Sequence, residues 1–199
     1  MDDIMQNNAQ EMVQLIAAVM ERADPLTAVH QRRVTELTSA IAAEMGLSQD
    51  TKRCLYVSAM IHDIGNLRIP MARDLLERPG SLTDREFAMV KIHPREGYKM
   101  LKSILFPWPV ADIVLQHHEM LDGSGYPEGL KGDDILLEAR IIRVADTVEA
   151  MMSDRPHRPS RGVEAVIDEL SGKRGVTYDP DAVDACLSLL GRDFTFYAV

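Results

Sequence analysis

Apolar residues recur with helical spacing along almost the whole chain, and no segment shows convincing alternation with a period of two. Glycine, proline and helix-capping residues divide this pattern into separate helices. The predicted helices cover residues 3–22, 25–45, 48–64, 83–104 (with a break at Pro94), 107–119, 137–153, 162–171 and 180–190. Between them, residues 65–82 and 120–136 are rich in glycine and proline and are predicted to be loops. The fold class is therefore predicted to be all-α, without a sheet.

Capping residues indicate where several of these helices begin. A side chain that can accept a backbone N–H precedes proline at two starts, Asp24-Pro25 and Asp179-Pro180. Ser48 is a third candidate cap, and Thr83 with Glu86 has the spacing of a capping box.

The length of 199 residues suits one domain with a core large enough to need no disulfide. A formal charge of −9 makes the chain a poor binder of polymeric nucleic acid or of an anionic membrane. Cys54 and Cys186 lie in apolar stretches and are predicted to be buried free thiols of a reducing compartment. Neither a signal peptide nor an apolar run of bilayer length is visible, so we expect a cytoplasmic protein.

Polar residues stand at several positions where the helical pattern calls for apolar ones. The pairs His62-Asp63 and His117-His118 each follow an apolar run, and Asp146 lies inside another. Burying such groups without partners costs free energy. Each case alone has an ordinary explanation: a buried histidine is usually hydrogen-bonded in the core, and Asp146 has Arg140 or Arg143 as candidate ion-pair partners.

The conjunction of these residues points to metal binding. Imidazoles and carboxylates together form a ligand set suited to Fe, Mn or Zn. Adjacent helical positions diverge by about 100°, so one helix end can address two neighbouring ions, with Asp63 between them. The candidate ligands are His30, His62, Asp63, His93, His117, His118 and Asp146.

Six motifs in this order resemble the HD-GYP family, a branch of the HD-domain metal-dependent phosphohydrolases. They are His30, HDIGN at 62–66, His93-Pro94, His117-His118, DGSGYP at 122–127 and RIIRVAD ending at Asp146. The resemblance implies an HD-domain helical bundle over residues 24–199, with an N-terminal helical extension over residues 1–23. It also implies hydrolysis of cyclic di-GMP, or of a related 3′,3′-cyclic dinucleotide such as cGAMP, to linear pGpG and in some members GMP.

The resemblance further implies two divalent metal ions, Fe or Mn, with Zn, Ni or Mg acquired on purification. The ligands of the first ion would be His30, His62, Asp63 and Asp146. Those of the second would be Asp63, His93, His117 and His118. A hydroxide bridging the two ions would attack the phosphorus. His62, Asp63 and Asn66 correspond to catalytic positions of the family.

Substrate contacts are implied at two places. In the loop, these positions are Asp122, Gly125, Tyr126 and Pro127. Tyr126 would contact the ligand or, alternatively, only pack within a tight turn. Beyond the last motif, Arg155 and Arg158 match positions that grip phosphate, although such residues also occur as solvated surface charges. His157 between them is not counted as a ligand.

The chain departs from the family pattern at three positions. Asn66 replaces a lysine near the substrate phosphate, a loss of charge that would cost about a few kcal/mol of transition-state stabilisation. A binding or interaction module with little turnover is therefore an alternative function, and a phosphohydrolase of mononucleotides or alarmones is a third. Leu26 replaces the glutamate of three-metal members, which predicts a two-metal site. Glu149 replaces a frequent aspartate and is expected to support a ligand.

Residues 3–22 carry an apolar stripe that leaves three roles open: packing on the domain, pairing with a second chain, or linking to a sensor domain. We favour the last two. The expected partners are thus the cyclic dinucleotide, sensory or receiver domains, a diguanylate cyclase, and a second copy of the chain.

Overall fold

The computed structural model describes residues 2–23, 25–69, 74–75, 78, 80, 82–154, 159–192 and 194–196. Its helices are α1 Asp2–Ala23, α2 Pro25–Glu44, α3 Gln49–Met60, η1 Ile64–Arg68, α5 Asp84–Val90, α6 His93–Leu101, α7 Val110–Gln116, η2 Gly132–Asp134, α8 Leu137–Met152, α9 Gly162–Lys173 and α10 Pro180–Leu190. Among the described residues the only β-type pairing is an isolated bridge between Arg174 and Tyr178. The prediction of an all-α fold is confirmed.

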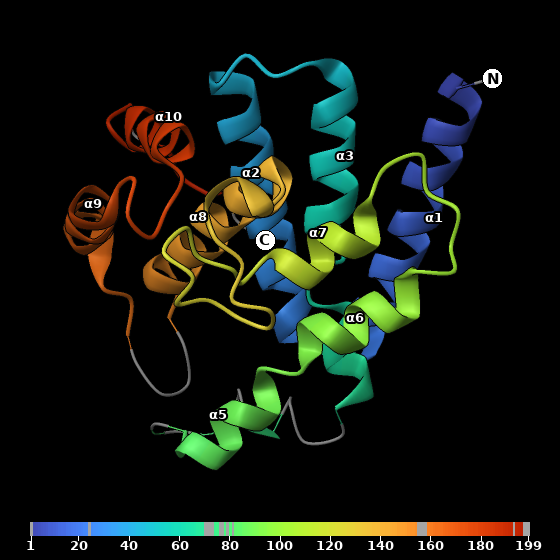
Figure 1. Cartoon of the computed structure of the whole chain (residues 1–199), viewed down its shortest axis with the longest axis horizontal. Helices are drawn as coiled ribbons and strands as arrows, with labels where there is room; N and C mark the ends of the chain where they lie inside the picture. The colour runs from blue at the N-terminus through green and yellow to red at the C-terminus, as the bar shows by residue number, and fades with distance from the viewer. Residues whose placement is uncertain are drawn as a thin grey trace.

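The main core lies where α2, α3 and α8 meet, with α9 and α10 against α8 (Figure 1). Leu37 and Ile41 of α2, Leu55 of α3 and Ile142 of α8 are fully buried there. Burying each such side chain contributes about 1.5–3 kcal/mol. Helices α2 and α8, which carry His30 and Asp146, and α3, which precedes His62 and Asp63, are therefore fixed against this core.

Helix caps form largely as predicted. The Ser48 side chain accepts the N–H of Thr51 at 3.1 Å, and both halves of the Thr83–Glu86 capping box are present. Asp179 accepts two backbone N–H groups of the first turn of α10, both at 3.0 Å. Asp24 lies outside the described residues.

The two helices that precede the His–Asp and His–His pairs end earlier than predicted. The helix predicted over residues 48–64 ends at Met60, and the helix predicted to reach Glu119 ends at Gln116. In both places the chain tightens into hydrogen bonds to the carbonyl three residues back, at 3.3 Å for the Ile61 N–H and 2.8 Å for the Glu119 N–H. The His–Asp and His–His pairs consequently lie in turns just beyond helix ends.

The break predicted at Pro94 is confirmed, since residues 83–104 form two helices, α5 and α6. Part of the loop predicted over 65–82 is instead the 3₁₀ helix η1. A close contact joins η1 to α6. A Cβ on Gly65 would lie 1.9 Å from the His93 carbonyl oxygen, so only glycine allows the two backbones to approach this closely. This contact holds the turn after α3 beside the start of α6.

Helix α1 packs along α2 and α3 (Figure 1). Val13 and Met20 are buried in this contact, whereas Leu15 and Val19 on another face of α1 are 68% and 59% exposed. Packing on the domain, the first of the three roles considered, is thus observed. Leu15 and Val19 are left uncovered by the rest of the described chain.

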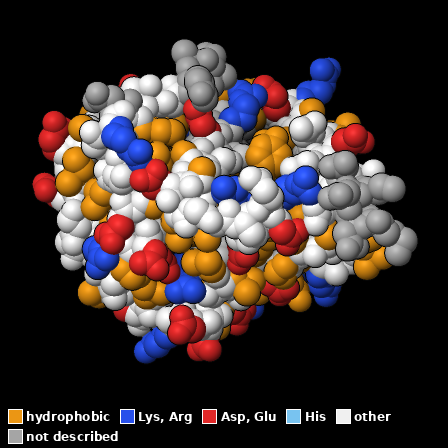
Figure 2. Space-filling view, turned by 90° about the horizontal axis from the view of Figure 1, so that it is seen from above, with side chains coloured by type: hydrophobic (Ala, Val, Ile, Leu, Met, Phe, Trp, Pro, Cys, Tyr) orange, Lys and Arg blue, Asp and Glu red, His pale blue; other side chains and the backbone are white. Residues whose placement is uncertain are grey.

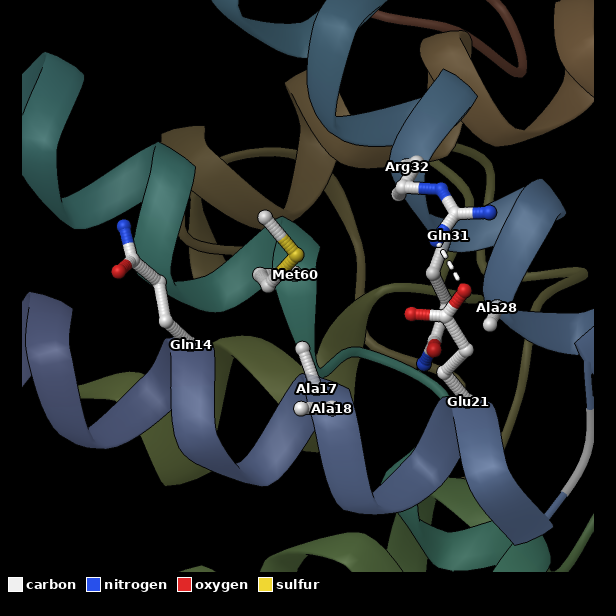
Figure 3. Close-up of a pocket in the computed structure, with 8 residues that line it drawn as sticks. All are labelled: Gln14, Ala17, Ala18, Glu21, Ala28, Gln31, Arg32 and Met60. Carbon is white, nitrogen blue, oxygen red and sulfur yellow. Dashed lines mark hydrogen bonds and ion pairs between the residues drawn. The ribbon is translucent and has the colours of Figure 1, made fainter. Parts of the chain in front are cut away.

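A hollow of about 190 Å³ remains between α1, α2 and α3 (Figure 3). Small side chains such as Ala17 and Ala28 leave this space, and Met60 forms part of its wall. An ion pair between Arg32 and Glu21, at 2.7 Å, crosses from α2 to α1 beside it. The lining contains none of the predicted ligands, so the hollow is separate from the candidate site.

Cys54 and Cys186 are buried and unpaired, as predicted. On the face shown in Figure 2, acidic and basic side chains are interspersed with hydrophobic ones, and no histidine is visible. That face carries no continuous basic patch of the kind that binds polymeric nucleic acid. None of the described helices is both long and apolar enough to cross a lipid bilayer.

Candidate metal centre

The structure brings all seven predicted ligands together in two adjoining groups. Cluster A consists of His30, His62 and Asp146. Cluster B consists of Asp63, His93, His117 and His118. Within each cluster, one potential ligand atom from every residue lies within 4.8 Å of the others. This division agrees with the two predicted ligand sets, in which Asp63 belongs to both.

The Asp63 carboxylate faces both clusters. Its Oδ1 lies 3.1 Å from His93 Nε2 and 3.8 Å from His117 Nε2, both in cluster B. Its Oδ2 lies 3.7 Å from His62 Nε2 and 3.9 Å from His30 Nε2, both in cluster A. Burial opposes ionisation, but the neighbouring imidazoles hold the pKa of Asp63 well below its usual value. One ionised carboxylate therefore offers one oxygen to each cluster.

Helix ends set the orientation of three imidazoles. Nδ1 of His62, His93 and His117 lies 2.7, 2.8 and 2.6 Å from the carbonyl three residues earlier, in the last turns of α3, α5 and α7. Carbonyls in these turns lack a helical N–H partner, so they are free to accept the Nδ1–H. Pro94 explains one case, because it has no N–H with which to occupy the Val90 carbonyl. Nε2 of each ring is thereby left for the centre.

His30 is held by a side chain rather than by the backbone. Its Nδ1 contacts Oε2 of Glu149, which is 1% exposed. The other oxygen of Glu149 accepts the Ser153 hydroxyl at 2.5 Å, and Ser153 accepts from Arg33 at 3.1 Å. Burial would lower the pKa of His30, but hydrogen bonds to Asp146 and Glu149 raise it to about 10. Glu149 thus supports a candidate ligand, as expected.

His117 and His118 have lowered pKa values and are therefore neutral imidazoles. Burial, followed by the charges of His93 and His62, lowers the pKa of His117 to about 3. Burial and the neighbouring His117 likewise hold the pKa of His118 well below its usual value. A neutral imidazole is the form that donates an electron pair to a metal.

The donor set fits a divalent metal. His62 Nε2 is buried and has no hydrogen-bond partner among the residues that the structure describes. His93 and His117 direct their Nε2 atoms at each other across 3.1 Å. Buried acceptors aimed at one another are costly unless a cation or proton neutralises them. Mixed nitrogen and carboxylate donors suit Fe, Mn or Zn, so the clusters can bind such ions.

Arg143 lies at the edge of both clusters. Its NH1 donates to His118 Nδ1 at 3.0 Å and lies 3.4 Å from Asp146 Oδ2. The other candidate partner of Asp146, Arg140, instead binds Asp179 at 3.0 Å. Arg143 therefore places a permanent positive charge at the centre.

The glycine-rich loop covers cluster B. The Tyr126 ring stacks on His118, with centroids 4.8 Å apart and planes 27° apart. Glu119 organises this loop from beneath: it is 2% exposed and accepts the N–H groups of Glu128, Gly129 and Leu130 at 2.6, 3.2 and 3.1 Å. This role of Glu119 was not predicted from the sequence. Its signal is an acidic residue directly between the histidine pair and a loop rich in unpaired N–H groups.

The remaining predicted site residues differ in placement. Asn66 lies in η1, and its Oδ1 is buried without a partner among the described residues. Asp122 is exposed and its side chain accepts from Ser124 within the loop. A Cβ on Gly125 would collide with the backbone of Glu119, and the Pro127 carbonyl accepts from Arg95. Arg155, His157, Arg158 and the side chain of Leu26 lie outside the described residues.

An all-helical domain that buries two joined His/Asp clusters is one that can bind divalent metal ions. A family model described as an HD domain matches residues 12–182. The chain therefore belongs to the HD-domain family, in its HD-GYP branch.

Two curated relatives and one solved structure illustrate the similarity. The cyclic di-GMP phosphodiesterase response regulator RpfG of Xanthomonas campestris is 37% identical over 185 residues, which are 92% of this chain and 48% of RpfG. The 3′3′-cGAMP-specific phosphodiesterase 1 of Vibrio cholerae is 35% identical over 154 residues, 77% of this chain and 35% of that protein. The chain thus spans about half the length of RpfG. The fold resembles Bd1817, an HDG"Y"P protein from Bdellovibrio bacteriovorus, with a TM-score of 0.68, 22% identity, and coverage of 94% of this chain and 69% of that one.

Proposed function

We propose that the chain hydrolyses cyclic di-GMP to linear pGpG or GMP, or opens a related 3′,3′-cyclic dinucleotide such as cGAMP to its linear form. The observation that carries this proposal is Asp63, whose two oxygens face two separate clusters of imidazole and carboxylate groups. Relatives named as cyclic di-GMP and 3′3′-cGAMP phosphodiesterases support the substrate class.

Two divalent ions, for which we propose Fe or Mn, would supply the nucleophile at neutral pH and offset the charge of the phosphate. The protein's own part is positioning. Asp63 holds its charge between the clusters, and helix-end carbonyls aim His62, His93 and His117 inward. Glu149 fixes the ring of His30 and keeps its Nε2 toward the centre.

We propose that substrate is held on the side of cluster B that the glycine-rich loop covers. Tyr126, already stacked on His118, would contact the ligand together with Asp122, Gly125 and Pro127 of the same loop. Arg155 and Arg158 are proposed to grip phosphate, since a guanidinium can bind two of its oxygens at once. Asn66 is proposed to lie near the reacting phosphate.

The test is an anaerobic assay of Mn- or Fe-loaded protein with cyclic di-GMP, followed by chromatography of the products. Appearance of pGpG, lost together with bound metal in His62→Ala and Asp63→Ala, supports the proposal. Asp168→Ala on the exposed face of α9 is the matched control and should retain both. Absence of product at high protein concentration with full metal occupancy overturns it.

The alternative function is dinucleotide binding with little turnover, which Asn66 favours because it lacks the charge of a lysine. Tight binding of cyclic di-GMP without hydrolysis in the same assay would establish this alternative.

We also propose that residues 1–23 serve as an extension through which the domain, residues 24–199, pairs with a second copy. Leu15 and Val19 are exposed one helical turn apart on α1 and have the apolar character of a helix-pairing stripe. Sedimentation should show a dimer that Leu15→Glu dissociates, and a monomeric unmodified chain contradicts the idea. We further propose that sensory or receiver domains and a diguanylate cyclase are partners of the chain. The proposed location is the cytoplasm, where thiols stay reduced.

A further inference from the structure

A row of aromatic rings leads from the candidate metal centre to the surface. Tyr126 stacks on His118, and Phe87 of α5 meets Tyr126 edge-on, with centroids 6.4 Å apart and planes 80° apart. Helix α5 lies at the edge of the molecule (Figure 1), and Phe87 is 44% exposed. A half-exposed phenylalanine gains only part of the free energy of burial, so its position beside the centre calls for another explanation.

Lys91 completes this arrangement. Its Nζ lies 4.6 Å from the Phe87 ring centroid and 5.0 Å from that of Tyr126. In the part of the chain that the structure describes, no carboxylate pairs with Lys91, whereas the nearby Arg95 and Lys99 are paired with Glu128 and Glu96. The ammonium group therefore keeps N–H groups free for a ligand that reaches the rings.

Local structure fixes the position of these groups. Phe87 and Lys91 are four residues apart at the end of α5, so their side chains lie on the same side of the helix. The start of α5 is held by the Thr83–Glu86 capping box. Tyr126 is held from the other side by the loop that Glu119 organises.

We propose that Phe87, Tyr126 and Lys91 form a subsite for one purine base, and that Lys91 makes this subsite prefer guanine. This inference rests on the proposed function, because it places one base of the cyclic dinucleotide. An aromatic face binds any base by stacking. Guanine presents two acceptors, O6 and N7, to a lysine, whereas adenine presents a donor at N6 beside N7. The ammonium can thus donate to both O6 and N7 of guanine, whereas the N6 donor of adenine repels it.

The experiment measures binding of GMP and AMP to the metal-loaded full chain by calorimetry, which requires no turnover. GMP should bind more tightly than AMP. Lys91→Met, which keeps the aliphatic stem, should reduce this preference by about tenfold. Phe87→Leu should weaken both nucleotides by about tenfold while leaving their ratio unchanged. Lys102→Met removes a similar lysine, 6.0 Å from the Tyr98 ring, and is the matched control.

Metal content and melting temperature are measured on every variant. If Phe87→Leu fails to fold, the result for Lys91→Met decides the question. The inference is overturned if GMP and AMP bind equally, or if neither binds. It is also overturned if Lys91→Met weakens both nucleotides equally, because Lys91 would then bind their phosphate. The cleavage assay reports the proposed function separately, since a chain can read guanine here without cutting a diester.

Discussion

Glu149 should control the affinity of cluster A for its ion. The substitution Glu149→Gln keeps the size of a side chain that is 1% exposed but removes its charge. His30 then loses the carboxylate that raises its basicity, while the Ser153 hydroxyl keeps an amide oxygen to bond. Glu149→Ala removes both contacts.

Loss of a group that orients a metal-binding histidine typically costs 10–100-fold in metal affinity. We expect about tenfold for Glu149→Gln and about 100-fold for Glu149→Ala, which correspond to about 1.4 and 2.7 kcal/mol. Because Glu149 contacts His30 of cluster A, we expect the affinity for the ion of cluster A to be the one that is weakened.

The assay is a chelator competition with Mn²⁺ that reports bound metal per chain against free metal. Glu169→Gln, a glutamate of α9 that accepts from Lys173 and Tyr178 away from the centre, is the control. Unchanged affinity in both Glu149 variants would refute the reasoning. So would equal weakening of both ions in a variant whose melting temperature is unaltered.

Three further predictions follow from the geometry. Asn66→Lys should raise kcat for cyclic di-GMP about tenfold or more, because it adds a charge near the phosphate; an unchanged or lower kcat in stopped-time assays contradicts this. Pro94→Ala should weaken metal binding about tenfold in chelator competition, because a new N–H competes with His93 for the Val90 carbonyl, and full affinity would dismiss that role. The ion-free protein should lose stability as the pH falls from about 6.5 to 4.5, because in this range the unfolded chain binds a proton that buried His117, with its pKa lowered to about 3, does not bind. In His117→Gln the melting temperature should therefore depend less steeply on pH. An identical pH dependence rejects the assignment to His117.

The candidate ligands could be predicted because they violate the helical pattern. Polar pairs such as His62-Asp63 at the end of an apolar run are visible in the sequence itself. Helix ends were harder to predict, because the tightening after Met60 depends on the contact of Gly65 with α6, far along the chain. Glu119 was missed for a related reason: its partners lie in an irregular loop that has no period to read.

Choices between partners also needed tertiary structure. The sequence offers both Arg140 and Arg143 to Asp146, and only the packing of α8 shows that Arg143 contacts it while Arg140 turns to Asp179. The specific contact between His30 and Glu149 joins residues 119 positions apart. Spacing along a single helix carries no information about such a pair.

The way the imidazoles are anchored makes individual histidines of the centre unequal in their response to mutation. A main-chain carbonyl is present whatever the side chain, so no single substitution at Ala59 or Val114 can delete the acceptor that orients His62 or His117. His30, by contrast, depends on one replaceable carboxylate. Inherited variation can therefore retune His30 by exchanging one side chain, whereas His62 and His117 keep their orientation for as long as the helix ends that hold them persist.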